Sequence, residues 1–304
     1  MSKLTIQAET YADAIKAYQN GENVIDFLRN QLQLDSNEPD IIELAYHLQS
    51  GTYIEFLINN TDLYSRYCLE LAEVLAEYVT RESAFLDVGS GELTTIAGVL
   101  THLPVAPCTT DVLDLSYARL QKGLQYFGNE QSKVVRGIRP VVGDMCRLPF
   151  KSKSFSVTTS SHALEPNGVH GYQILSELCR VTRDYLVLFE PCYEAGSNEV
   201  KSRMEKLGYI KAIPHMLHDI GCTLKHCFAI NAVFNPLNPT YCYVIEVPRY
   251  NGVVVQDSIH SVPGSDFGLV TTMNGLYSSE TGLLFPVING IPVLRLEKAT
   301  LVIQ

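Results

Sequence analysis

Residues Phe85 to Thr95 read FLDVGSGELTT. A short apolar run carries Asp87 near its end, Gly89-Ser90-Gly91 follow, and the next residues have helical spacing. A strand, a glycine turn and a helix in this order let the backbone pass close under a ligand at the carboxyl end of a strand. A tight strand-to-helix turn without any ligand is the alternative interpretation.

The turn does not match the dinucleotide fingerprint G-x-G-x-x-G, because Thr94 occupies the third glycine position. A carboxylate at Asp87 would also lie unfavourably close to a pyrophosphate. An acid beside the turn instead suits a ligand with a cationic amino group.

Strand and helix patterns alternate around this turn. The segments AFLDV, VAPCTTDV, RPVVGD, FSVTTSS and DYLVLFEP are strand-like, and helical patterns separate most of them. This alternation predicts an α/β fold with a doubly wound, mostly parallel sheet, since parallel strands need crossover helices. TLKHCFAINAV and TYCYVIEV follow each other without a helix, so we expect an antiparallel hairpin at the edge of a seven-stranded, Rossmann-like sheet.

The chain divides into three predicted parts. Residues 1–80 have helical spacing, with one buried face at Tyr67, Leu71, Val74, Leu75 and Tyr78. Residues 81–248 hold the sheet, and residues 249–304 form a small β-rich tail.

Composition narrows the function classes. The formal net charge is -10 and no basic run could follow a track of phosphates, so we expect no nucleic-acid partner. No apolar stretch approaches the roughly 20 residues that span a bilayer, and no signal peptide is evident. We therefore expect a cytoplasmic protein without a membrane partner. The eight cysteines contain no C-x-x-C pair and are expected to be reduced.

Further acids occur where ligand groups would be needed. Asp111 lies about 20 residues beyond the turn, at the spacing expected of a ribose ligand, and Asp114 in DLSYARLQKG is the other candidate, or a helix N-cap. In VVGDMCRLPF, Asp144 could accept from an exocyclic amine while Met145 covers a ring; the alternative is that Asp144 caps the next turn.

The motifs DVGSGE, DLS, GDMCRLPF and SSHALEP, in this order, resemble those of class I S-adenosylmethionine-dependent methyltransferases over residues 81–248. The resemblance implies S-adenosylmethionine as cofactor, with its methionine end near Asp87 and the glycine turn, and its adenine near Asp144 and Met145. The implied cofactor-binding residues are Asp87, Gly89, Ser90, Gly91, Asp111, Asp114, Asp144, Met145, Ser161 and Tyr53. Leu93 departs from the pattern, because many members have a third glycine there.

YHLQSGTYI, the LEPNGVHGY segment and NPLNPT resemble a bacterial subgroup associated with surface-sugar biosynthesis, including pseudaminic acid. In such proteins the N-terminal helices lie over the cofactor, which makes Tyr46, Gln49 and Tyr53 candidate lid residues. Aromatic packing on a helix face is the alternative for these three.

Methyl transfer needs a nucleophile held in line with the methyl group, and a hydroxyl nucleophile benefits from a base. His162 is the candidate base or acceptor-positioning residue, and Glu165 and Glu190 are candidate acceptor-binding groups. The alternatives are that His162 packs beside the cofactor and that Glu190 caps a helix.

We expect no metal site. HMLHDIGCTLKHC is rich in His and Cys, but Gly221 separates its two halves and His226 and Cys227 should point to opposite sides of a strand. The tail phrase GLYSSETGLLFPVINGIPVLRLEKA resembles the zinc-ribbon protein that partners several methyltransferases, yet residues 249–304 contain no cysteine. The tail should therefore be a metal-free ribbon, packed through Leu283, Phe285, Val287, Ile291 and Val293.

These observations favour a methyltransferase that acts on oxygen or nitrogen of a small polar metabolite, most plausibly a sugar or nucleotide-sugar. A tailoring enzyme for a peptide or secondary metabolite and a catalytically silent scaffold are the alternatives. An exposed edge strand and the β tail are compatible with a homodimer.

Overall fold

The computed structural model describes residues 7–34, 39–129, 137–248 and 258–302 of the 304-residue chain. Within these ranges no helix is both long and apolar enough to cross a membrane.

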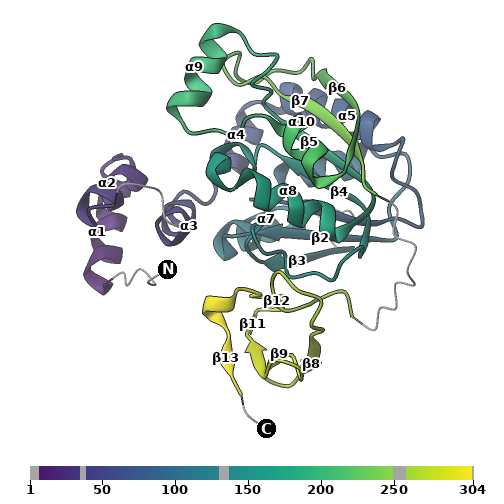
Figure 1. Ribbon diagram of the computed structural model, residues 1–304. Helices are drawn as coiled ribbons and strands as arrows, with labels where there is room; N and C mark the ends of the chain where they lie inside the picture. Colours follow the sequence, from purple (N-terminus) through teal and green to yellow (C-terminus); the bar gives the residue numbers. More distant parts are fainter. Residues whose placement is uncertain (1–6, 35–38, 130–136, 249–257, 303–304) are drawn as a thin grey trace.

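A seven-stranded sheet forms the centre of the molecule, in the order β3-β2-β1-β4-β5-β7-β6 (Figure 1). The strands β1 to β5 run parallel, and β7 is antiparallel to both of its neighbours. The bounds are β1 Ala84–Val88, β2 Thr109–Asp114, β3 Ile138–Val142, β4 Phe155–Ser161, β5 Thr182–Glu190, β6 Thr223–Ala229 and β7 Tyr241–Glu246. The predicted sheet and its antiparallel last hairpin are confirmed. The strand order reverses between β1 and β4, because β2 and β3 are added on one side of β1 and β4 and β5 on the other. Open α/β sheets bind their ligands at such a point.

Helices cover both faces of the sheet because alternate strand residues point to opposite sides. Phe85 packs in one cluster with α5 (Thr61–Leu75), α6 (Thr94–His102) and α7 (Tyr117–Asn129). Leu86 packs in the other cluster with α8 (Gly171–Val181) and α10 (Ile213–Ile220). The buried face predicted for residues 67–78 is present: on α5, Tyr67, Leu71 and Leu75 are buried and Val74 is partly buried. Tyr78, also partly buried, lies in the turn after the helix. The remaining helices of this part are the 3₁₀ helix η2 (Glu165–His170) and α9 (Asn198–Lys206).

The N-terminal segment begins with three helices that have a small core of their own (Figure 1). They are α1 Ala8–Gln19, α2 Val24–Gln31 and α3 Pro39–Leu48, and α4 Thr52–Asn59 follows. Leu28 and Ile41 are fully buried in that core. The α4 helix lies between this bundle and the sheet domain and begins at Gly51, whose φ of 108° is in the left-handed region that favours glycine.

The C-terminal tail forms a small four-stranded sheet and a short hairpin next to β3 (Figure 1). Its elements are β8 Val270–Thr272, β9 Gly275–Tyr277, β10 Leu283–Phe285, β11 Val287–Ile288, β12 Ile291–Pro292, the 3₁₀ helix η3 Leu296–Lys298 and β13 Thr300–Leu301. Of the predicted packing residues, Phe285, Ile291 and Val293 are buried and Leu283 is partly buried. The prediction was wrong for Val287, which is 42% exposed on the hairpin β11–β12.

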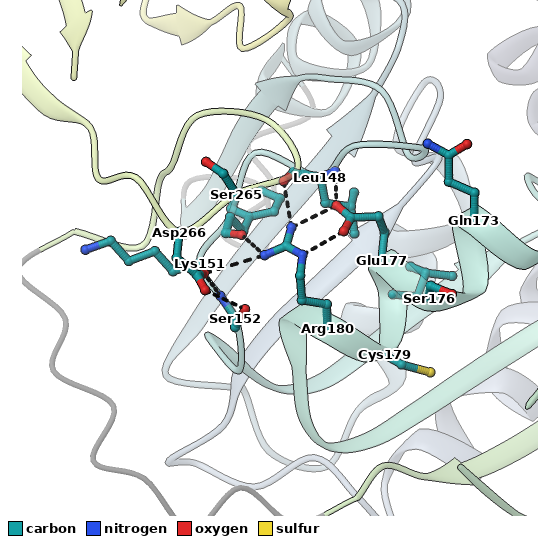
Figure 2. Close-up of polar contacts among 12 residues, drawn as sticks. Leu148, Lys151, Ser152, Gln173, Ser176, Glu177, Cys179, Arg180, Ser265 and Asp266 are labelled. Carbon is teal, nitrogen blue, oxygen red and sulfur yellow. Dashed lines mark hydrogen bonds and ion pairs between the residues drawn. The ribbon is translucent and has the colours of Figure 1, made fainter. Parts of the chain in front are cut away.

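The start of the tail is attached to the sheet domain by a charged network (Figure 2). Arg180 of α8 donates to the carbonyls of Leu148 and Phe150 and forms an ion pair with Glu177. Asp266 of the tail accepts from the backbone N–H of Ser152 at 2.6 Å and lies 3.7 Å from Arg180. These contacts join α8, the loop after β3 and the tail into one unit.

Helix α7 approaches the turn after β1 at Gly123. A Cβ atom at this position would lie 2.4 Å from the carbonyl oxygen of Glu92 and 2.9 Å from Cγ of Leu93. The absence of a side chain at Gly123 therefore determines how closely α7 packs against the glycine turn.

We predict that Gly123→Ala lowers the free energy of unfolding by about 1–3 kcal/mol, because the added methyl overpacks rigid backbone. Gly128→Ala is the matched control in the same helix: its Cβ would meet nothing within 4 Å, so the helix should gain up to about 1 kcal/mol. Denaturant unfolding of both variants measures the two effects. Equal stability of the two variants would contradict the packing described here.

Candidate functional site

The turn after β1 is packed so tightly that it requires glycine. Gly89 and Gly91 have φ angles of 79° and 52°, in the left-handed region. A Cβ at Gly89 would lie 2.1 Å from Cβ of Ala163, in the turn that follows β4. The carboxyl ends of β1 and β4 therefore meet at this point, and Ser90 closes the turn by donating its hydroxyl to the Asp87 carbonyl at 3.0 Å.

Leu93 has the backbone geometry that glycine would provide. Its φ is 61°, a conformation that costs an L-residue roughly 1–2 kcal/mol, and its side chain is fully buried. The side chain lies against Gly123, where α7 leaves room for it. The departure from the glycine-rich pattern therefore preserves a left-handed turn.

Asp87 places a buried acid at the start of the turn. Its side chain is 6% exposed, and burial raises its pKa to about 7, against the effect of a hydrogen bond from Ser90 and with a contribution from the nearby charge of Asp114. A carboxylate that is costly to ionise when alone is stabilised by a cation. This position consequently suits the ammonium group of a ligand.

The two candidate ribose ligands occupy different places. Asp114 ends β2 at the carboxyl edge, where it accepts from the N–H groups of Gly91 and Ser116, each at 2.8 Å. Asp111 lies three residues earlier in β2, fully buried and paired with Arg139 of β3. The sequence spacing favoured Asp111, but β2 continues to Asp114, and of the two only Asp114 lies at the carboxyl edge, so we expect the ribose at Asp114.

Asp144 and Met145 lie in the loop directly after β3. Oδ1 of Asp144 accepts from the N–H of Cys146 at 2.8 Å, which is the turn-capping role considered as the alternative from the sequence. The Met145 methyl group would be 3.6 Å from a Cβ at Gly89. The structure thus brings Met145 to the glycine turn, and Asp144 holds the loop that carries it.

A polar cluster follows β4. Nδ1 of His162 lies 2.8 Å from Oε2 of Glu165, and Nε2 lies 2.6 Å from Oγ1 of Thr240. Asn238 also donates to Oε2 of Glu165, at 2.9 Å. Burial lowers the pKa of His162, but the hydrogen bond and charge of Glu165 outweigh it, so the pKa is raised overall. Ser161, also in the predicted site, pairs with the hydroxyl of Tyr67 at 3.0 Å.

Glu190 ends β5 beside this cluster, and the charges of His162 and Glu165 act on it. It is fully buried, and its carboxylate accepts from the backbone N–H groups of Ala163, Leu164 and Glu165. Burial raises its pKa to about 7, partly offset by the charge of His162. Glu190 therefore holds the turn that carries His162. The acceptor-binding role expected from the sequence stays a prediction.

The N-terminal helices lie over the glycine turn. The ring of Tyr53 would be 3.8 Å from a Cβ at Gly91. The guanidinium of Arg119 lies over the rings of Tyr46 and Tyr53, 4.2 Å and 4.7 Å from their centroids. Of the three lid candidates, Tyr46 and Tyr53 thus reach this edge; Gln49 is half-buried directly after α3.

Several residues of the site were not identified from the sequence. Glu92, in the DVGSGE motif, is fully buried and accepts from the N–H groups of Gly51 and Ile54 at 2.7 Å and 2.9 Å, so it caps α4. Arg119 and Thr240 were missed as well. Glu92 could have been suspected from its charge in an otherwise apolar segment.

The histidine-rich segment 215–227 forms no metal centre in the described part of the chain. His215 and His218 are exposed and lie beside Asp219. Among the described residues, no group of three or more His, Cys, Asp or Glu side chains is arranged to hold a metal ion.

Residues 86–187 match the model of a family described as "Methyltransferase domain". No curated protein matches the chain. Among solved structures, a chain from the complex between the Haloferax volcanii Trm112 methyltransferase activator and a methyltransferase is 14% identical, with a TM-score of 0.51 over 66% of this chain and 98% of that one. Geranyl diphosphate C-methyltransferase from Streptomyces coelicolor A3(2) is 11% identical, with a TM-score of 0.45 over 59% and 77%.

The likeness to the Haloferax volcanii chain shows the fold, and the family match adds the class of domain. The chain contains a class I S-adenosylmethionine-dependent methyltransferase domain, and S-adenosylmethionine is its cofactor. The residues present fit this molecule: a buried acid suits its ammonium, an acid at the end of β2 suits its ribose, and side-chain-free backbone lies between them.

We predict that Asp114→Asn weakens binding of S-adenosylhomocysteine at least tenfold, about 1.4 kcal/mol, because a charged acceptor at the edge is lost. Asp111→Asn is the matched control from the same strand and should change binding less than twofold. Isothermal titration of both variants measures the difference. The ribose assignment is overturned if Asp111→Asn proves to be the more damaging change.

Binding should also depend on pH through Asp87. Because its pKa is raised to about 7, the free protein holds a proton there below that pH, and an ammonium ligand must displace it. Affinity should therefore rise with pH from about 5.5 to 7, by up to about tenfold per pH unit. The same titrations on Asp87→Asn should give weaker binding with a flat profile over this range. If the affinity of Asp87→Asn still rose with pH, the titrating proton would belong to a group other than Asp87.

Proposed function

We propose that this protein transfers a methyl group from S-adenosylmethionine to an oxygen or nitrogen of a small polar metabolite, most plausibly a sugar or nucleotide-sugar. The observation that carries this proposal is the polar cluster at the end of β4, where His162, Glu165, Asn238 and Thr240 meet. Hydrogen-bonding side chains of this kind suit a hydroxyl-rich acceptor. The resemblance of short segments to surface-sugar enzymes supports the narrower choice.

The cluster can orient a base. Glu165 accepts the proton of Nδ1, which leaves Nε2 of His162 as the acceptor for the Thr240 hydroxyl. When bound, S-adenosylmethionine supplies a methyl group already activated on a sulfonium. The Thr240 hydroxyl would then be placed to take a proton from an acceptor hydroxyl and to pass its own proton to Nε2. The acceptor oxygen would displace the sulfonium, which would leave as the neutral thioether. A neutral amine would need only the positioning.

We also propose that the tail acts on the methyltransferase domain in cis. The tail resembles the zinc-ribbon partner of other methyltransferases, and the Haloferax volcanii chain was solved in complex with an activator. Here the tail is covalently attached and packs beside β3. Attachment in cis would make a separate activator unnecessary.

Methyl transfer from labelled S-adenosylmethionine to a panel of sugars, nucleotide-sugars, amines and peptides tests the proposed function. With the best acceptor, His162→Gln should lower kcat about 100-fold, while S-adenosylhomocysteine binding stays within twofold. The activity of wild type should rise with pH through the raised pKa of His162, since the base must be unprotonated.

His218→Gln serves as the control, because the His218 side chain is 88% exposed and lies on α10, outside the polar cluster after β4. Full activity of His162→Gln would remove the base from the proposal. Transfer only to peptides would replace the sugar acceptor, and binding of the donor without transfer to any acceptor in the panel would favour the silent scaffold.

A further inference from the structure

The tail holds the loop after β3 at both of its ends. At the first end, the N–H of Leu294 donates to the carbonyl of Val142 at 2.8 Å, directly before Gly143 and Asp144. At the other end, the N–H groups of Gly264 and Ser261 donate to the carbonyls of Leu148 and Pro149. The loop proposed to bind adenine therefore has its path fixed by backbone hydrogen bonds from the tail.

Arg295 follows Leu294 and reaches in the other direction, toward the N-terminal helices. Its guanidinium forms ion pairs with Glu43 of α3 and with Glu297 of the tail. The Arg295 side chain is 2% exposed, whereas those of Glu43 and Glu297 are 24% and 25% exposed. A second polar contact joins the tail to α7, from Asn289 to the hydroxyl of Tyr117 at 2.9 Å.

Helix α3 leads from this ion pair to the donor edge, by which we mean the glycine turn after β1 together with Asp114 at the end of β2. One turn beyond Glu43, the carbonyl of Tyr46 accepts from Nε of Arg119 at 3.3 Å, and the Tyr46 ring packs under the same guanidinium. Arg119 contacts Tyr53 of α4 as well, and its charge acts on Asp114. The tail is thus connected to the proposed ribose position through Glu43 on α3 and then through Arg119.

From these contacts we propose that Arg295 is a positioning residue for cofactor binding: by pairing with Glu43 it holds α3 and α4 over the glycine turn, so that Tyr46, Tyr53 and Arg119 close the donor edge. The proposal rests on the proposed function, because it takes this edge as the S-adenosylmethionine site. It assigns to one side chain of the tail a specific action on the lid.

The charges explain why this pair matters more than an exposed one. An arginine stays protonated at all relevant pH values, so a buried guanidinium must be neutralised by its neighbours. Without it, Glu43 and Glu297 would no longer be bridged by a shared cation, so the charged link between α3 and the tail would be lost. The α1–α3 bundle has its own core and could move as a unit.

The test compares Arg295→Gln, Glu43→Gln, the double variant and Arg295→Lys in the full-length chain. We expect Arg295→Gln to weaken S-adenosylhomocysteine binding at least tenfold by isothermal titration, and Arg295→Lys to recover part of the loss. The double variant should bind better than the product of the two single losses predicts, because both substitutions break one contact.

Asp266→Asn is the matched control. It loosens the tail at Ser152 and Arg180 but leaves the ion pair between Arg295 and Glu43 in place, so it should weaken binding clearly less than Arg295→Gln does. If Asp266→Asn weakens binding as much as Arg295→Gln, the effect belongs to tail docking in general and the proposal is overturned. Unchanged binding by Arg295→Gln overturns it directly.

Amide hydrogen exchange of the ligand-free proteins separates this proposal from the proposed function. Arg295→Gln should raise exchange in residues 43–59 at least fivefold while β1 and β4 stay protected; Asp266→Asn should leave residues 43–59 unchanged. Should wild type fail to bind the ligand, the proposed function fails, and the exchange result alone then decides whether Arg295 positions the lid. Equal exchange in wild type and Arg295→Gln would refute that role.

Discussion

The contact between Gly89 and Ala163 is the constraint on which the site depends. A Cβ at Gly89 would lie 2.1 Å from that of Ala163, so the turns after β1 and β4 can approach only because one of them has no side chain. This approach brings the glycine turn after β1 and the polar cluster after β4 to one edge of the sheet. Packing of α7 against the turn after β1 supports this approach: Gly123 has no side chain, which leaves space for the side chain of Leu93. Glu190 fixes the opposite turn by accepting three backbone N–H groups.

Around this edge, charged side chains connect the N-terminal helices and the C-terminal tail. Glu92 in the glycine turn caps α4, and Arg119 lies between the lid tyrosines and Asp114. Arg295 links the tail to α3. Each of these charged groups is buried or partly buried, where an electrostatic interaction is less screened than at the surface. The N-terminal helices and the tail, which pack separately against the sheet domain, are thereby connected to the same few residues of the edge.

The sequence was sufficient for the fold, because each strand is a short apolar run and the hydrophobic patterns change period between strands and helices. It was sufficient for the turn as well, since Asp87, Gly89 and Gly91 are adjacent in the chain. It could not separate Asp111 from Asp114, because ribose spacing alone does not show that β2 continues to Asp114 or that Arg139 pairs with Asp111. The backbone contacts of Glu190 were missed for a related reason: its three hydrogen bonds go to residues 25 to 27 positions earlier. The Arg295–Glu43 pair joins residues 252 positions apart, a distance at which no local pattern can indicate contact.

The most direct test of the cofactor site is a crystal structure of the protein with S-adenosylhomocysteine. We expect the ammonium of the ligand beside Asp87, its ribose hydroxyls on Asp114, and its adenine between Met145 and the loop that Asp144 holds, with Tyr53 above the glycine turn. Ligand density at another place, or a complex in which Asp87 and Asp114 contact no ligand atom, would contradict the assignment of this edge as the methyl-donor site.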